Sequence, residues 1–273
     1  MLHNQIYEVD NCWDKSGQVE NTFLCVYNGQ DLSHHVKKIL LPPLFSESND
    51  DAVDEGGMAT CRWSNSLYVW QSGPSTWPHG SDIWRLVPNA DGGFRVMEWP
   101  TFAPSDESLD FSSVSRIVIN DVSVLDDGNL LVLREVFCSC DEEEVNHILS
   151  IHRPDGSVIR DIILSYNAVI SNVAMKSNGN FVYAQVTRDL PDDCVIQEVD
   201  KDGKAVRHFH CSHFVSGFHS GCKQLFLDAC DRVIFLDGYD KCIFLDCELN
   251  FLGEVEILEV EPVNAFNESS MSI

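Results

Sequence analysis

Short apolar segments recur along the chain, each beginning at a tight turn and ending at a polar residue. Five of them share β-branched, aromatic and aliphatic residues: Gln5–Asp10, Ser66–Gln71, Asn129–Arg134, Asn180–Gln185 and Arg232–Asp237. This composition is typical of β-strands. Successive segments start 61, 63, 51 and 52 residues apart. A repeat of roughly 50 residues that contains only strands predicts a β-propeller.

Further apolar segments complete a unit of four strands around each of these segments. An inner strand precedes it in four units, at Met58–Arg62, Asp121–Leu125, Asn172–Lys176 and Gln224–Asp228. A third strand follows it, at Phe23–Tyr27, Asp82–Val87, His147–His152, Cys194–Val199 and Cys242–Asp246. The outermost strand comes last, at Lys37–Leu41, Phe94–Trp99, Val158–Leu164, Ala205–Phe209 and Gly253–Leu258. Asp-Gly steps in several of the connecting turns favour tight hairpins.

The predicted fold is all-β, a propeller of four-stranded antiparallel blades. About five blades are visible, and the first is incomplete because it starts at its second strand. An irregular β-sandwich is the alternative. We expect one domain over residues 1–260 and a C-terminal tail over residues 261–273. Because both faces of a blade pack on neighbours, we expect six buried side chains: Val132, Leu133, Val182, Ala184, Phe235 and Leu236.

Three of these stretches resemble blades of NHL-repeat propellers, the kind found in tripartite-motif-like proteins: Val122–Val136, His147–Leu164 and Leu225–Val255. The resemblance implies a propeller, usually of six blades, and it implies no catalytic residues. No RING, B-box or coiled-coil pattern precedes the repeats, so ubiquitin-ligase activity is not carried over from that family.

A weaker resemblance links the chain to regucalcin-type gluconolactonases. Those propellers hold a calcium-like ion through one Glu, two Asn and one Asp near the tops of the inner strands. The similar segments here imply Asn120 and Asn172 as ligands, whereas Gln224 stands where an Asp is expected and the Glu has no counterpart. Neutral amides alone hold a hard divalent cation poorly. A metal-dependent hydrolase is therefore the alternative function.

The lengths of the connections distinguish the two faces of the predicted propeller. Connections after inner strands and before outer strands are short and share one face, the tight-turn face. The other connections reach the opposite face, the long-loop face: 11–22, 42–57, 72–81, 100–118, 136–146, 186–193 and 211–221. Long loops on a rigid scaffold are the usual place for binding residues. Among them, Trp77 and His79 place an indole and an imidazole at one loop tip.

The polar residues that end the five apolar segments occupy one repeat-equivalent position and are predicted to line the long-loop face: Asp10, Gln71, Arg134, Gln185 and Asp237. Arg134 is the only cation among them. It either pairs with a carboxylate such as Glu135 or Asp121, or meets an anionic group of a ligand.

Charge and cysteine content narrow the class of partner. The 18 Lys and Arg against 43 Asp and Glu give a net charge of −25, which excludes general nucleic-acid binding and disfavours an anionic membrane surface. The sequence shows no secretory signal and no apolar run of about 18 residues. We therefore expect a cytoplasmic protein, in which most of the 11 cysteines are reduced.

Two clusters contain metal-ligand residue types without a standard spacing. The first comprises His208, His210, Cys211, His213, His219 and Cys222, and the second is the pair Cys138 and Cys140. Neither matches a zinc motif, and no phosphate loop or nucleophile elbow occurs. We expect no cofactor. The sequence favours a non-enzymatic scaffold that binds a protein or peptide partner, possibly a basic one, on the long-loop face.

Overall fold

The structure is a computed structural model of the chain. It describes residues 5–13, 19–28, 31–40, 55–61, 66–72, 83–90, 93–99, 114–138, 141–166, 168–187, 190–211, 224–236 and 241–256. Within these ranges the chain forms strands and turns and no helix. In the part of the chain that the structure describes, no helix has the length and apolar character needed to cross a membrane.

The strands form five antiparallel sheets, which we call blades 1 to 5 in chain order. Blade 1 has three strands, β1 (Gln5–Trp13), β2 (Val19–Asn28) and β3 (Asp31–Leu40). Blade 2 contains β4 (Glu55–Cys61), β5 (Ser66–Ser72), β6 (Ile83–Pro88) and β7 (Phe94–Trp99). Blade 3 contains β8 (Val114–Val124), β9 (Leu130–Cys138), β10 (Asp141–His152) and β11 (Val158–Tyr166).

Blades 4 and 5 repeat this order. Blade 4 contains β12 (Ala168–Met175), β13 (Phe181–Thr187), β14 (Leu190–Val199) and β15 (Ala205–His210). Blade 5 contains β16 (Gln224–Leu227), β17 (Val233–Leu236), β18 (Lys241–Leu245) and β19 (Phe251–Glu256). The all-β prediction of four-stranded blades with an incomplete first blade is confirmed.

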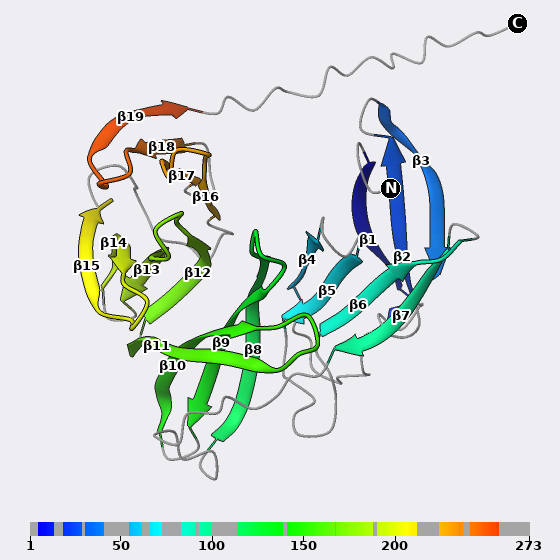
Figure 1. Cartoon of the computed structure of the whole chain (residues 1–273), viewed down its shortest axis with the longest axis horizontal. Helices are drawn as coiled ribbons and strands as arrows, with labels where there is room; N and C mark the ends of the chain where they lie inside the picture. Colours follow the sequence, from blue (N-terminus) through cyan, green and yellow to red (C-terminus); the bar gives the residue numbers. More distant parts are fainter. Residues whose placement is uncertain are drawn as a thin grey trace, which may run out of the picture.

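The blades follow one another around an arc, with blades 1 and 5 at its two ends (Figure 1). The first strands of blades 2 to 5 lie toward the inside of this arc, and β4, β8, β12 and β16 contact one another in sequence. Three hairpins differ from the prediction. Strands β1 and β2, β9 and β10, and β13 and β14 extend into the expected loops 11–22, 136–146 and 186–193.

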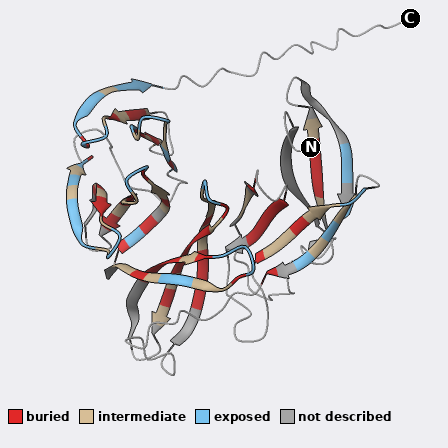
Figure 2. Cartoon of the chain, viewed as in Figure 1, coloured by how far each residue is buried: buried red, intermediate tan, exposed pale blue. Residues whose placement is uncertain are grey.

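Buried residues occur along the strands of the blades (Figure 2). The hydrophobic clusters join neighbouring blades and do not form one central layer. In blade 4, Phe181 and Tyr183 pack against blade 3, whereas Val182 and Ala184 pack against blade 5. Alternate residues of one strand therefore belong to two different interfaces, which is why the apolar runs are continuous. Five of the six side chains expected to be buried are buried. Leu236 is only half-buried, because it points away from blade 4.

The inner strands of blades 2 to 5 share one repeat-equivalent position, which we call the inner-strand polar position: Gly57, Asp121, Asn172 and Gln224. In blades 3 and 4, the side chain at this position makes polar contacts with the following blade. The carboxylate of Asp121 in blade 3 accepts a hydrogen bond from the backbone N–H of Val173 in blade 4. Asn172 accepts from the N–H of Leu225 in blade 5 at 2.9 Å and donates to the carbonyl of Leu225 at 2.7 Å. The side chains of Asp121 and Asn172 thus bind the backbone of the following blade.

A second set of contacts uses the turn between the third and fourth strands of the following blade. The second residue of that turn presents its carbonyl to the preceding blade in three successive cases. Trp99 Nε1 donates to Pro154 O at 3.2 Å, and Arg160 Nη1 donates to Lys201 O at 2.8 Å. Lys176 Nζ donates to Cys247 O at 2.8 Å. Three chemically different donors, an indole, a guanidinium and an ammonium group, therefore bind the carbonyl at the equivalent turn position of three successive blades.

Candidate functional site

The tight-turn face uses its carboxylates to hold its own turns. Each of these Asp side chains accepts hydrogen bonds from backbone N–H groups of its own turn: Asp127, Asp155, Asp200, Asp228 and Asp246. The backbone N–H groups of Lys204 and Asp202 hold the pKa of Asp200 below its usual value. Such groups stabilise turns and leave this face few carboxylates for a partner.

Arg134, a predicted binding residue, lies in the interior and not on a face. Its side chain is 2% exposed. Nη1 donates to Ser150 Oγ at 2.6 Å, and Nη2 donates to His152 Nε2 at 3.1 Å. The partners expected from the sequence were Glu135 or Asp121. The guanidinium bonds to side chains of the adjacent strand β10 of the same sheet.

The structure describes three of the other predicted binding residues, Asp10, Gln71 and Gln185. Asp10 lies on β1 and Gln71 on β5, where their backbones pair with Phe23 and Gly56. Gln185 is half-buried on β13. Strands β5 and β13 run on past Gln71 and Gln185, so these residues do not end their strands as predicted. Trp77, His79 and Asp237 lie outside the described residues.

The residues suggested by the gluconolactonase resemblance lie on two inner strands, Asn120 on β8 and Asn172 on β12. Asn172 has both ends of its carboxamide bonded to Leu225. Asn120 lies at a register irregularity of β8, between Ile119 and Asp121. Across the described ranges, no group of three or more His, Cys, Asp or Glu side chains could hold a metal ion. His208 and His210 are exposed on β15 with ring centroids 5.0 Å apart, and His213, His219 and Cys222 fall outside the description.

Two polar pairs in blade 3 were not found from the sequence. His147 is fully buried on β10, and its Nε2 lies 2.9 Å from Glu135 Oε1 on β9. His147 Nδ1 has no hydrogen-bond partner. His152 packs edge-on against Trp99 of blade 2 with ring centroids 5.0 Å apart, and its Nδ1 lies 3.0 Å from Gly156 O. Neither histidine has a sequence neighbour that would mark it as functional.

Two of these interior groups have strongly shifted pKa values. Burial and the charge of Arg134 lower the pKa of His152 to about 4, so the imidazole is neutral and accepts from the guanidinium. Burial raises the pKa of Asp121 to about 6, although the N–H of Val173 and the Ser123 hydroxyl at 3.4 Å oppose the shift. The inner-strand polar position of blade 3 thus holds a carboxyl group that ionises with difficulty.

These shifts predict opposite pH dependences for the two groups. The pKa of His152 is lower in the folded protein than in the unfolded chain. The contribution of His152 to the free energy of unfolding is therefore complete above pH 6.5 and is lost as the pH falls toward 4. The pKa of Asp121 is raised from 3.8 to about 6, so its contribution is lost as the pH rises through this range. Asp121→Asn should therefore raise the free energy of unfolding by about 3 kcal/mol at pH 7.5 and little at pH 4.

Urea unfolding of wild type and Asp121→Asn at several pH values measures this difference. His152→Gln is the companion variant and should reduce the loss of stability between pH 6.5 and 4. A gain from Asp121→Asn that is the same at pH 4 and pH 7.5 would contradict the raised pKa.

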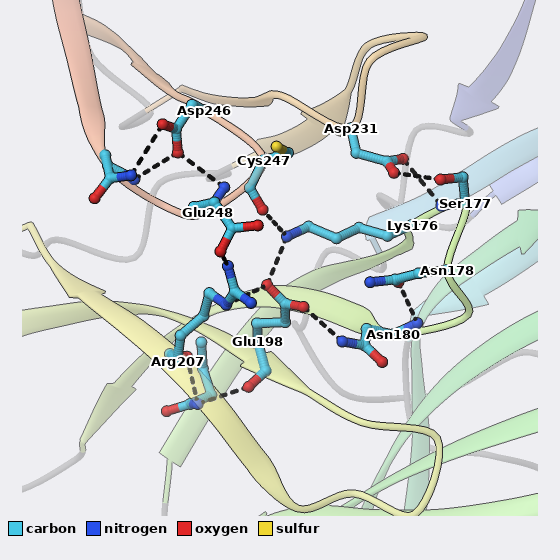
Figure 3. Close-up of polar contacts among 12 residues, drawn as sticks. Lys176, Ser177, Asn178, Asn180, Glu198, Arg207, Asp231, Asp246, Cys247 and Glu248 are labelled. Atoms are coloured by element: carbon cyan, nitrogen blue, oxygen red, sulfur yellow. Dashed lines mark hydrogen bonds and ion pairs between the residues drawn. The ribbon is translucent and has the colours of Figure 1, made fainter.

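The largest described polar cluster lies between blades 4 and 5 (Figure 3). Lys176 and Glu198 are 2% and 1% exposed, and their Nζ and Oε2 atoms are 2.5 Å apart. Asn180 Nδ2 donates to Glu198 Oε1 at 2.6 Å, and Arg207 Nε lies 3.3 Å from Oε2. Arg207 Nη1 also pairs with Glu248 of blade 5. Lys176 and Glu198 each have several hydrogen-bonding or charged partners. Because the contacts of Lys176 and Arg207 reach Cys247 and Glu248 of blade 5, this cluster is an inter-blade contact.

Comparison with known proteins identifies the class of fold. No known family pattern and no curated protein matches the sequence. A Bacteroides caccae protein of unknown function is similar in structure, with a TM-score of 0.56 and 12% identity over 95% of this chain and 75% of that chain. A Hadza microbial sialidase has a TM-score of 0.52 and 9% identity, covering 87% of this chain and 52% of its own. Trypanosoma rangeli sialidase in complex with 2,3-difluorosialic acid has a TM-score of 0.50 and 11% sequence identity. The match covers 89% of this chain and 44% of the sialidase chain.

The blades and these similarities define an all-β protein with a β-propeller arrangement. The chain spans about half or less of each sialidase, and identities this low establish the fold alone. The comparisons give no support to the NHL or regucalcin resemblance at the level of family.

Proposed function

We propose that this β-propeller is a non-enzymatic interaction scaffold that binds a protein or peptide on its long-loop face. The observation that carries the proposal is the difference between the two faces. On the tight-turn face, five carboxylates, including Asp155, Asp200 and Asp228, are bonded within their own turns. By strand order, β3, β5, β7 and β15 run toward the opposite face. The sequence segments that follow them, 41–54, 73–82, 100–113 and 212–223, are the longest between successive strands.

The charge of the protein favours a basic partner. The net charge is −25, and the connections of the long-loop face contain acidic pairs at Asp50–Asp51 and Asp106–Glu107. Trp77 and His79 add an aromatic anchor of the type found at binding hot spots. Asp10, Gln71, Gln185 and Asp237 remain candidates for the same face, whereas Arg134 does not because it is buried.

The cellular location is part of the proposal. Cys61, Cys194, Cys230 and Cys247 are free thiols, as proteins of reducing compartments usually have. We place the protein in the cytoplasm. We also treat residues 1–260 as a single propeller domain.

A hydrolase is the second candidate. The half-buried carboxyl group of Asp121 favours it, since a carboxylic acid with a pKa near 6 can serve as a general acid. Its bond to the Val173 N–H and the full use of the Asn172 carboxamide support a structural role for this position instead. The scaffold is therefore the function that the geometry supports best.

Peptide binding tests the scaffold. Fluorescence anisotropy with Lys/Arg-rich peptides should show binding that weakens as salt is raised, and matched Asp/Glu-rich peptides should not bind. Trp77→Ala should weaken binding about tenfold or more. The double variant Asp106→Asn/Glu107→Gln should weaken it several-fold. Its matched control, Asp126→Asn/Asp202→Asn, removes the same charge from the tight-turn face and should bind as wild type does.

Hydrolysis of fluorogenic lactones and sialosides, with calcium and then with EDTA, tests the alternative. Turnover that requires calcium and is lost in Asn120→Ala would replace the scaffold by the hydrolase. Equal effects of the two charge variants on peptide binding would instead refute the choice of face.

A further inference from the structure

Two histidines project from the same face of the outermost strand of blade 4. His208 and His210 are two residues apart on β15, and alternate residues of a strand share a face. Both residues are exposed. Arg207 and Phe209 lie on the opposite face of the strand. Arg207 pairs with Glu248 of blade 5, and Phe209 packs against the core between blades 4 and 5. The two imidazoles therefore face away from blade 5.

Hydrogen bonds hold the backbone that carries the two imidazoles. His208 lies opposite Gln197 on β14. Gln197 Nε2 donates to the carbonyl oxygen of Arg207, next to His208, at 2.8 Å. On the other side of the pair, the backbone N–H of Cys211 donates to the carbonyl oxygen of Cys194 at 2.7 Å. The segment is thus fixed at both ends, and a site built on such a strand keeps its geometry better than a site on a loop.

The two rings lie close together. Residues two apart on a strand start about 6.6 Å apart, since the rise is about 3.3 Å per residue. The ring centroids of His208 and His210 are only 5.0 Å apart, with an angle of 88° between the ring planes, so the rings lean toward each other. Two imidazoles that share one ion, each with a nitrogen about 2.1 Å from it, have centroids about 5 Å apart. The observed separation is therefore the one that a shared ion requires.

The chemistry of the pair selects a class of ion. Imidazole is a preferred ligand of Ni²⁺, Cu²⁺ and Zn²⁺, whereas Ca²⁺ and Mg²⁺ prefer oxygen ligands. The net charge of −25 attracts cations of either kind to the protein. In the described part of the chain, no larger group of His, Cys, Asp or Glu side chains could hold an ion. Two imidazoles suffice where water fills the remaining coordination positions, as it fills the open position of a catalytic zinc site.

We propose that His208 and His210 together bind one divalent transition-metal ion of the Ni²⁺, Cu²⁺ and Zn²⁺ class, each through one ring nitrogen. Rotation about the side-chain bonds is enough to turn both nitrogens toward a common point, because the ring separation already fits. His210 is the last residue of β15, which runs toward the long-loop face. The ion therefore lies beside that face, with coordination positions open to solvent. The site does not depend on the scaffold function proposed above.

Calorimetric titration of the full chain with Ni²⁺ at pH 7.5 tests this site. The wild type should bind one equivalent. His208→Ala and His210→Ala should each weaken binding about tenfold or more, because either change leaves a single imidazole. The double variant should bind about as weakly as each single variant, because the chelate is already lost. Both residues are exposed, so the three variants should unfold at the same urea concentration as the wild type.

The matched control removes two other exposed metal-ligand residues. Cys230→Ser/Cys247→Ser deletes two exposed thiols of the tight-turn face and should leave Ni²⁺ binding unchanged. Loss of binding in this control would assign the ion to the thiols and overturn the proposal. Undiminished binding in either histidine variant, or no saturable binding by the wild type, would overturn it as well. Losses that add up in the double variant would show two independent weak sites in place of one shared ion.

Discussion

Lys176→Met should lower the free energy of unfolding by about 3–5 kcal/mol, because it leaves the carboxylate of Glu198 buried without its closest cation. Glu198 is 1% exposed, so water cannot replace the lost ammonium. Arg207 and Asn180 remain within hydrogen-bond distance of Glu198, which places the expected loss toward the lower end of this range. The Cys247 carbonyl also loses its donor. Urea unfolding at pH 7 measures the change.

Two further variants separate the ion pair from general damage. Arg207→Gln removes a cation that is 30% exposed and should cost about 1 kcal/mol or less. The double variant Lys176→Met/Glu198→Leu replaces the pair by apolar side chains and should recover much of the loss. If the double variant is less stable than Lys176→Met alone, the cost does not come from an unpaired buried charge.

Phe235→Ala should destabilise the protein by about 3–5 kcal/mol, because it opens a cavity in the core between blades 4 and 5. Phe235 is fully buried and packs in a cluster with Val182, Ile196 and Leu225. Thermal and urea unfolding measure the loss. Phe251→Ala is the matched control: this ring is 42% exposed and stacks on Phe209, so about 1 kcal/mol is expected. Equal losses in the two variants would contradict the assignment of strand faces in blade 5.

The positions of the strands could be predicted from the sequence because the signals are local. Segments such as Asn180–Gln185 combine a turn, an apolar run and a polar end within a few residues, and β13 begins within one residue of the prediction. The lengths of hairpins were less predictable. Strand β10 begins with the acidic stretch Asp141–Glu144, where charged side chains obscure the strand pattern.

Side-chain roles were harder to predict, because they depend on partners far away in the sequence. Arg134 ends an apolar run, which suggested a surface residue, but its partners Ser150 and His152 come from the adjacent strand. Lys176 and Glu198 are ordinary polar residues of a strand pattern, and their pairing depends on the turn of blade 4 folding back on β14. The sequence predicted inner strands that begin at Asp121, Asn172 and Gln224. The structure adds that Asp121 and Asn172 make inter-blade contacts there.

In the inter-blade contacts described above, side chains of one blade donate hydrogen bonds to carbonyl groups of the blade that follows it in the sequence. This order has a consequence for synthesis on the ribosome. Lys176 requires Glu198, 22 residues later, and the Cys247 carbonyl, 71 residues later. Translation therefore completes all four strands of blade 4 well before the carbonyl that accepts from Lys176 has left the exit tunnel. Until then, the nascent chain exposes the apolar side of blade 4 at Val182, Ala184 and Ile196. One apolar side of each blade is therefore covered only when the next blade has been synthesised and has folded. During translation, the blade most exposed to aggregation or to chaperone binding is the last one completed.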